Sequence, residues 1–313
     1  MYKNIVNNPF QTTIQKPVIF QGIGLHSGLK SKIKILPKEA DEGIVFKRVD
    51  LKENNFIEAN YQNVNKAKLC TTLENNSGAK VSTVEHLLAA MYIAGIDNAL
   101  IEINTEEVPI MDGSAKDFLA VFKETIIKTL PKKRKFLKVS DKIELTDGEK
   151  NISLEPSDDS LEVEFNLNYE NKIISNQKNT VNFVKDNLDQ VIESRTFCLL
   201  NDIEKIKKAG LAKGGSLENA IVVDEVRVLN EGGLRNKKEF VNHKILDLVG
   251  DFMLAGIRIK GKVKCYQGGH LLTNMFLRKL FQNPSNYFIE IPQDKTFQKD
   301  TNINKNIQLA VNA

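Results

Sequence analysis

A helical pattern over residues 236–255 constrains the fold of this chain most, because it is apolar on nearly every side. One face carries regularly spaced apolar residues, and the opposite stripe carries polar residues with apolar neighbours in the same sector. A helix with apolar residues all round is typical of a protein interior. We therefore expect a buried helix, with Val241, Ile245, Leu248 and Phe252 on the apolar face and His243, Asp247 and Asp251 on the polar stripe.

The two carboxylates on this helix need a compensating partner, because burying a lone charge costs several kcal/mol of folding free energy. His243 and Asp247 stand one helical turn apart and offer an imidazole nitrogen and a carboxylate oxygen, a donor pair that suits zinc. The alternative is a hydrogen bond between His243 and Asp247 that satisfies a buried polar spot. Taken alone, the pair favours this alternative.

A second helical pattern, over residues 81–94, offers a third ligand. His86 lies off its apolar stripe, and the neighbouring Glu85 is placed to act as a general base on a metal-bound water. Alternatively, Ser82 and Glu85 match a capping box, in which Glu85 only satisfies a backbone N–H. Three protein ligands from two helices would leave a fourth position for water, which is the arrangement of a catalytic zinc site.

Two further histidines lie beside glycines. His270 follows Gly268 and Gly269 and precedes a helical pattern over residues 271–281, so its side chain is expected to point into a cleft or to cap that helix. His26 lies in a glycine-rich turn over residues 22–28, with no phosphate-loop Lys-Ser/Thr after it. We interpret His26 as structural.

The order of patterns predicts an α+β fold of two similar domains, each a β-sheet packed with two helices, with the active site between them. The first half reads as strands, a helix at 81–94, a strand at 99–103 and a helix at 114–129, and the second half again runs from strands to helices. We place the domains at residues 1–130 and 136–300, joined by a solvated basic linker at 131–135. Residues 301–313 resemble a frayed tail.

Composition limits the classes of function. The 313 residues carry a net charge of +4, which argues against nucleic acid as a partner. No run approaches the ~20 apolar residues of a membrane span, and the start lacks a signal-peptide core, so we expect a cytoplasmic protein without a transmembrane segment. Cys70, Cys198 and Cys265 lie far apart, which argues against a disulfide scaffold or a thiolate zinc cluster. We expect a monomer.

Several motifs, in order along nearly the whole chain, resemble the UDP-3-O-acyl-N-acetylglucosamine deacetylase family, cytoplasmic zinc amidases that perform the committed deacetylation of lipid A synthesis. They are TVEHL at 83–87, GIDNA at 95–99, VPIMDGS at 108–114, SRTF at 194–197, VLNE at 228–231 and HKxxD at 243–247.

This resemblance implies a role for each matching residue. Zinc would be bound by His86, His243 and Asp247, and these ligand types also accept Fe²⁺. The family's general base, general acid, orienting carboxylate and oxyanion hydrogen-bond donor fall, respectively, on Glu85, His270, Asp251 and Thr196.

The resemblance also implies the substrate contacts. Lys244 would contact the phosphate of UDP-3-O-acyl-N-acetylglucosamine, and Phe197 would line the site. Residues 211–223, which include Leu217, resemble the insert that forms the acyl-chain passage, and the alternative is an ordinary hairpin. Lys150 and Tyr169 fall where the family contacts the nucleotide, although Asn168 replaces an expected carboxylate.

The predicted function is hydrolysis of the N-acetyl group of this nucleotide sugar. A metal amidase acting on another acylated amino sugar is one alternative. A zinc-stabilised protein that binds a nucleotide sugar without turnover is another, but a structural zinc has four protein ligands and needs no Glu or His in reserve.

Overall fold

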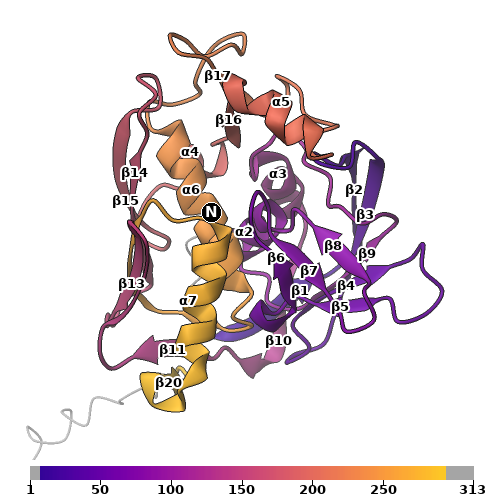
Figure 1. Cartoon of the computed structure of the whole chain (residues 1–313). Coiled ribbons are helices and arrows are strands. Elements are labelled where there is room, and N and C mark those ends of the chain that lie inside the picture. The colour runs from indigo at the N-terminus through magenta and orange to yellow at the C-terminus, as the bar shows by residue number, and fades with distance from the viewer. Residues whose placement is uncertain (1–7, 294–313) are drawn as a thin grey trace, which may run out of the picture.

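The computed structural model describes residues 8–293, and two five-stranded sheets form its outer layers (Figure 1). The N-terminal sheet has the order β2-β3-β9-β4-β5. Its central strand pairs antiparallel with β3 and parallel with β4. The bounds are β2 (Val18–Ile23), β3 (Lys30–Pro37), β4 (Ile44–Arg48), β5 (Phe56–Glu58) and β9 (Ala99–Ile103).

The C-terminal sheet repeats this topology in the order β12-β13-β19-β14-β15. Its central strand also pairs antiparallel on one side and parallel on the other. Strands β14 and β19 alternate buried with more exposed residues, as expected for a sheet with one face on the core. The bounds are β12 (Ile143–Asp147), β13 (Lys150–Glu155), β14 (Leu161–Asn168), β15 (Asn176–Asn182) and β19 (Gly261–Tyr266).

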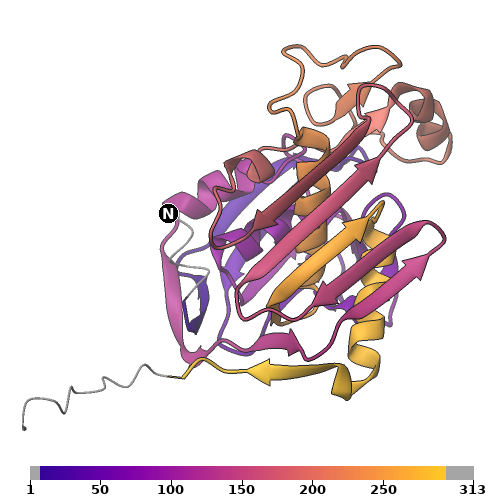
Figure 2. The same cartoon turned by 90° about the vertical axis from the view of Figure 1, so that its left-hand side faces the viewer.

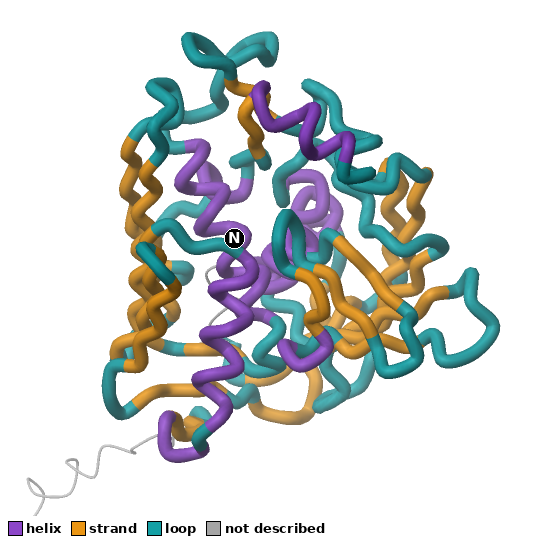
Figure 3. Tube along the Cα trace, in the orientation of Figure 1, coloured by secondary structure: helices purple, strands orange, loops and turns teal. Residues whose placement is uncertain are grey.

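Helices α2, α3, α6 and α7 pack between the two sheets, as Figures 1 and 3 show. In Figure 2 the C-terminal sheet lies in front of them. In each half one helix precedes the central strand and another follows it, which confirms the predicted α+β fold of two similar layered units. The helices are α2 (Glu85–Ala94), α3 (Lys116–Glu124), α4 (Asp189–Ile192), α5 (Leu200–Lys208), α6 (Glu239–Met253) and α7 (His270–Gln282).

The two central helices, α2 and α6, approach closely where a glycine faces the start of α2. A Cβ added at Gly250 would lie only 2.0 Å from the carbonyl oxygen of Glu85. Any side chain at this position would therefore push the helices apart. The contact places the first turn of α2 beside the C-terminal part of α6, and it joins the two halves of the chain.

Smaller sheets complete the fold. The β5–α2 connection carries the three-stranded sheet β6-β7-β8, and the β15–α6 connection carries the parallel pair β16-β17. Their bounds are β6 (Val64–Lys66), β7 (Thr72–Glu74), β8 (Lys80–Ser82), β16 (Phe197–Leu199) and β17 (Ile221–Val223). The remaining elements are β1 (Phe10–Ile14), β10 (Ile127–Lys133), β11 (Phe136–Val139), β18 (Arg258–Ile259), β20 (Tyr287–Glu290) and the 3₁₀ turns at Tyr61–Asn63 and Pro284–Asn286.

Local spacing misplaced several boundaries. The helix expected over 81–94 begins only at Glu85, because Thr83 has a φ of 57° and turns the chain out of β8. The helix expected over 114–129 ends at Glu124, and the following residues form β10, which pairs with β1. The basic stretch is not a solvated linker throughout: Arg134 is buried, and its Nε lies 2.8 Å from the carboxylate of Asp97.

Strand β10 thus runs into the predicted division between residues 130 and 136, and the exact domain boundary stays a prediction. The predicted tail at 301–313 lies outside the described residues. Within residues 8–293, no helix is long and apolar enough to cross a bilayer.

Candidate active site and metal centre

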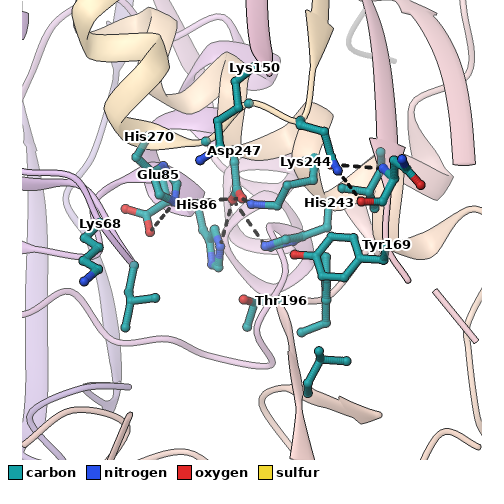
Figure 4. Close-up of a pocket in the computed structure, with 18 of the residues that line it drawn as sticks. Lys68, Glu85, His86, Lys150, Tyr169, Thr196, His243, Lys244, Asp247 and His270 are labelled. Atoms are coloured by element: carbon teal, nitrogen blue, oxygen red, sulfur yellow. Dashed lines mark hydrogen bonds and ion pairs between the residues drawn. The ribbon is translucent and has the colours of Figure 1, made fainter. Parts of the chain in front are cut away.

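Three buried side chains from α2 and α6 converge on one point. One ligand atom from each of His86, His243 and Asp247 lies within 4.8 Å of the other two. Oδ1 of Asp247 lies 3.4 Å from Nε2 of His86 and 3.3 Å from Nε2 of His243 (Figure 4). The structure thus brings together the three predicted ligands, although about half the chain separates His86 from His243 and Asp247.

The protonation of this group favours a bound cation. Burial lowers the pKa of His243 to about 3, so the ring is neutral at physiological pH. Its Nδ1 lies 3.1 Å from the carbonyl oxygen of Ser194, which can only accept, so Nδ1 carries the proton and Nε2 presents a lone pair. Oδ1 of Asp247 is buried without a hydrogen-bond partner. Lone pairs that face one another without a proton between them repel, and a metal ion relieves this repulsion.

The donor set therefore fits a metal ion better than the alternative of a His243–Asp247 hydrogen bond. The other oxygen of Asp247 already faces a positive charge, because Nζ of the half-buried Lys244 lies 2.5 Å from Oδ2 of Asp247. Burial alone would raise the pKa of Asp247, but His243 and Lys244 outweigh it and hold the pKa well below its usual range. Asp247 is thus a carboxylate with one oxygen free to bind a cation.

His86, His243 and Asp247 are called the metal group below. Next to them, four buried residues form a closed ring of interactions. Nδ1 of His270 lies 2.8 Å from Oδ2 of Asp251, and the hydroxyl of Thr71 donates to Oδ1 of Asp251 at 2.6 Å. The backbone N–H of Thr71 donates to Oε2 of Glu85 at 3.0 Å. The ring closes where Oε1 of Glu85 lies 3.8 Å from Nε2 of His270.

This ring shifts the two groups with predicted acid and base roles. Burial raises the pKa of Glu85, despite the opposing effect of His270. Burial alone would lower the pKa of His270, but Asp251 and Glu85 outweigh it and raise the pKa to about 9. A carboxylate with a raised pKa beside a protonated imidazole is a base and acid pair poised for proton transfer.

The structure rejects the capping-box interpretation of Glu85. Helix α2 has no side-chain cap, and the carboxylate of Glu85 accepts a hydrogen bond from Thr71, fourteen residues earlier in the chain. The backbone N–H of Ser82 donates instead to the carbonyl oxygen of Glu106. Glu85 is therefore held toward the metal group by the small β6-β7-β8 sheet.

A cavity of about 900 Å³ opens over these groups. The predicted substrate-contacting residues Lys150, Tyr169, Phe197 and Lys244 line it together with Thr196, whereas Asp251 lies behind His270. Figure 4 shows Tyr169 on the side of His243, Glu85 and His270 on the side of His86, and Thr196 below the two histidine rings. The side chains predicted to carry out the chemistry and those predicted to contact the substrate thus line the same cavity.

A second, mostly apolar cavity of about 320 Å³ adjoins the first, and Leu217 lines it. The wall is not the hairpin considered above, because β17 pairs in parallel with β16 through the intervening helix α5. Helix α5 was missed by the sequence analysis. It has no fully buried residue, and its apolar side chains Ile203 and Ile206 line this cavity.

Comparison with known proteins shows one family. Residues 11–282 match the family model described as UDP-3-O-acyl N-acetylglycosamine deacetylase. The chain is 43% identical over 272 residues to the UDP-3-O-acyl-N-acetylglucosamine deacetylase of Geotalea uraniireducens (strain Rf4), covering 87% of this chain and 88% of that protein. It is 39% identical over 276 residues to the protein of the same name from Haemophilus ducreyi (strain 35000HP / ATCC 700724), covering 87% and 90%.

The chain belongs to this family. It is an enzyme of the deacetylase class, and its His86, His243 and Asp247 form a group that can hold a metal ion.

Other features position the cavity wall of this family member. Glu239, fully buried at the start of α6, accepts hydrogen bonds from the backbone and guanidinium of Arg195. The next residue, Thr196, donates its backbone N–H to Gly113 at 2.8 Å. The side chains of Thr196 and Phe197 are thereby fixed between the two halves.

Sequence reasoning missed Lys68 and Thr71 and gave His26 no role in the site, although the structure brings all three residues there. Lys68 and His26 line the large cavity, and Thr71 joins Glu85 to Asp251. His26 was interpreted as structural, but its glycine-rich turn faces the cavity. The turn signal was visible, whereas no local pattern links Thr71 to a carboxylate 180 residues away.

Proposed function

We propose that this enzyme hydrolyses the N-acetyl group of UDP-3-O-acyl-N-acetylglucosamine, giving UDP-3-O-acyl-glucosamine and acetate, the committed step of lipid A biosynthesis. The observation that carries the proposal is the arrangement of His86, His243 and Asp247, whose donor atoms face one another beside Glu85 and His270. We propose zinc as the metal, since two imidazoles and one carboxylate suit it, with Fe²⁺ as an alternative that the same donors accept.

The metal, when bound, supplies a Lewis acid that polarises the amide carbonyl and lowers the pKa of water. Glu85 accepts the proton of the water that attacks the carbonyl carbon. Its burial and raised pKa make it a stronger base than an exposed carboxylate. The hydroxyl of Thr196, on the cavity wall, donates a hydrogen bond to the oxygen that gains negative charge.

His270 delivers a proton to the departing nitrogen as the C–N bond breaks. An acid must be protonated before the step, and the nearby carboxylate of Asp251 favours the imidazolium. Asp251 therefore acts through His270, and Thr71 holds Asp251 in place through its hydroxyl. The products are a carboxylate and an amine, so the proton taken by Glu85 and the one given by His270 balance.

The cavities accommodate the two ends of the substrate. We assign the acyl chain to the apolar 320 Å³ cavity lined by Leu217 and the nucleotide sugar to the 900 Å³ cavity. In the larger cavity Lys244 and Lys150 supply positive charge for the phosphates, and Tyr169 and Phe197 supply ring faces. Glu85 and His270, held in reserve beside the metal group, argue against a protein that only binds the nucleotide sugar.

Acetate release from UDP-3-O-acyl-N-acetylglucosamine tests this proposal. The purified enzyme should release one acetate per substrate, lose activity on chelation and regain it with Zn²⁺. Glu85→Gln, with metal content checked, is the matched control for contaminating hydrolases. Undiminished activity after complete metal removal would overturn the proposed metal dependence, and binding without acetate release would support the non-catalytic alternative.

A further inference from the structure

A histidine without hydrogen-bond partners lies where the two substrate cavities meet. Among the described residues, the buried side-chain nitrogen and oxygen atoms without a partner belong to His86, Asp247 and His26. The first two residues belong to the metal group. For His26 both ring nitrogens lack a partner, and leaving such groups unsatisfied costs stability unless a ligand uses them.

The backbone of His26, in contrast, is held firmly on both sides. Its N–H and that of Ser27 donate to the buried carboxylate of Glu107 at 2.8 and 2.7 Å. Its carbonyl oxygen accepts from the N–H of Lys213 in the loop that borders the apolar cavity. Residues from both halves of the chain therefore hold the backbone of this turn. The imidazole nitrogens of His26, in contrast, have no hydrogen-bond partner among the described residues.

Glycine is required for this arrangement. A Cβ at Gly24 would lie 2.4 Å from Oε2 of Glu107, so only glycine lets the carboxylate reach the two backbone N–H groups. No hydrogen bond within the described residues fixes the orientation of the ring about its Cβ–Cγ bond. A half-turn exchanges the positions of ring nitrogens and carbons on the side chain, which remains partly exposed.

The position of His26 selects the substrate group it meets. Five described residues line both the sugar cavity and the acyl cavity: Leu25, His26, Leu69, Thr196 and Phe197. Only His26 and Thr196 have polar side chains among them, and Thr196 is assigned to the reacting carbonyl. In a 3-O-acylated sugar, the ester on C3 adjoins the carbon that carries the acetamide, so this ester must cross from one cavity to the other at this wall.

We propose that His26 donates a hydrogen bond to the carbonyl oxygen of the acyl ester and so makes the enzyme select 3-O-acylated nucleotide sugars. This inference rests on the proposed function. An ester carbonyl only accepts hydrogen bonds, and a neutral imidazole carries one N–H donor. Burial lowers the pKa of His26, in keeping with a neutral ring. This hydrogen bond therefore increases the affinity for a substrate that fills both cavities.

Comparing two substrates shows whether His26 binds the acyl ester or only stabilises the turn. UDP-3-O-acyl-N-acetylglucosamine carries the ester, and UDP-N-acetylglucosamine lacks it. We expect His26→Phe, which keeps a ring but loses the donor, to lower kcat/KM about tenfold for the acylated substrate and to leave the unacylated one unchanged. His26→Gln, which keeps a donor, should retain most of the selectivity. Ser27→Ala is the control for disturbance of the turn.

The same variants are tested by equilibrium binding of the products, UDP-3-O-acyl-glucosamine and UDP-glucosamine, which needs no turnover. His26→Phe should weaken only the acylated product. Equal losses for both members of a pair, or no loss for either, would overturn the role of His26. Absence of acetate release by the unsubstituted enzyme would instead overturn the proposed function, so the two failures are distinct.

Discussion

The two halves of this molecule have one topology but different chemistry. In each, a five-stranded sheet places its central strand, β9 or β19, between an antiparallel and a parallel neighbour. In each, one helix precedes that strand and one follows it, so α2 corresponds to α6 and α3 to α7. The proposed metal-binding and proton-transferring groups are not repeated. Helix α2 supplies Glu85 and His86 in its first turn, whereas α6 supplies His243 and Asp247 and α7 supplies His270.

The insertions differ as well. The connection before α2 forms a small sheet whose neighbouring Thr71 binds both Glu85 and Asp251. The connection before α6 forms β16, α5 and β17 and lines the apolar cavity. The repeated scaffold thus places two helices face to face. The site is formed by residues that differ between the two halves.

The largest effect should come from the metal ligands, to which both halves contribute. His86→Ala in α2 and His243→Ala in α6 each leave two protein ligands, so we expect loss of tightly bound metal and about 10³-fold lower turnover. Metal content after dialysis and acetate release are the measurements. Stoichiometric, tightly held metal in either variant would show that the substituted residue is not a ligand. It would contradict a metal site to which both halves contribute.

Glu85→Gln tests the contribution of α2 without removing a ligand. Glutamine can still accept the hydrogen bond from Thr71 but cannot take a proton, so turnover should fall by ~10² or more. Melting temperature and metal content should stay near those of the unsubstituted enzyme. Preserved activity in a destabilised protein would give Glu85 a structural role only.

The pH profile tests the contribution of α7 and its partner on α6. His270 must be protonated to act as an acid, so the rate should fall as pH rises through its pKa of about 9. Glu85 must be ionised, so the rate should also fall as pH drops through its raised pKa, above the usual range of a carboxyl group. The result is a bell-shaped profile of kcat/KM, with apparent values that belong to the coupled pair.

Asp251→Asn removes an anion beside His270 and should move the alkaline limb to lower pH. His270→Ala should lower turnover by ~10² while metal is retained. An alkaline limb that does not move in Asp251→Asn would show that His270 does not set it.

The smallest of these effects concerns the contact between the halves. Gly250→Ala places a methyl group against the carbonyl oxygen of Glu85 and should cost about 1–3 kcal/mol of unfolding free energy. It should also lower turnover, because Glu85 moves with its helix. Gly269→Ala is the matched control, since that backbone is extended and the added Cβ meets nothing within 4 Å. Equal stabilities for the two variants would contradict the close helix contact.

The sequence was sufficient to predict the three side chains that could hold a metal ion, because they lie in local motifs. His243 and Asp247 share a helical face at a fixed spacing, and Glu85 and His86 adjoin each other. The helix over 239–253 could be predicted within a few residues because its apolar pattern is long.

Long-range pairing explains what was missed. Strand β10 forms because it pairs with β1, about 120 residues earlier. The buried Arg134 is paired with the carboxylate of Asp97, which lies before β9 in the N-terminal half. Helix α5 is short and strongly charged, so it lacks the apolar pattern that reveals α6. Thr71 and His26 gain their positions from contacts with Asp251, Glu107 and Lys213, which no local spacing encodes.

Anomalous diffraction at the zinc edge, from crystals of the enzyme purified with its metal, tests the central claim most directly. The account predicts one strong peak within ~2.0–2.2 Å of Nε2 of His86, Nε2 of His243 and Oδ1 of Asp247, so that a single ion joins the two halves. A peak bonded to residues of only one half, or fully loaded metal located away from these three atoms, would contradict it.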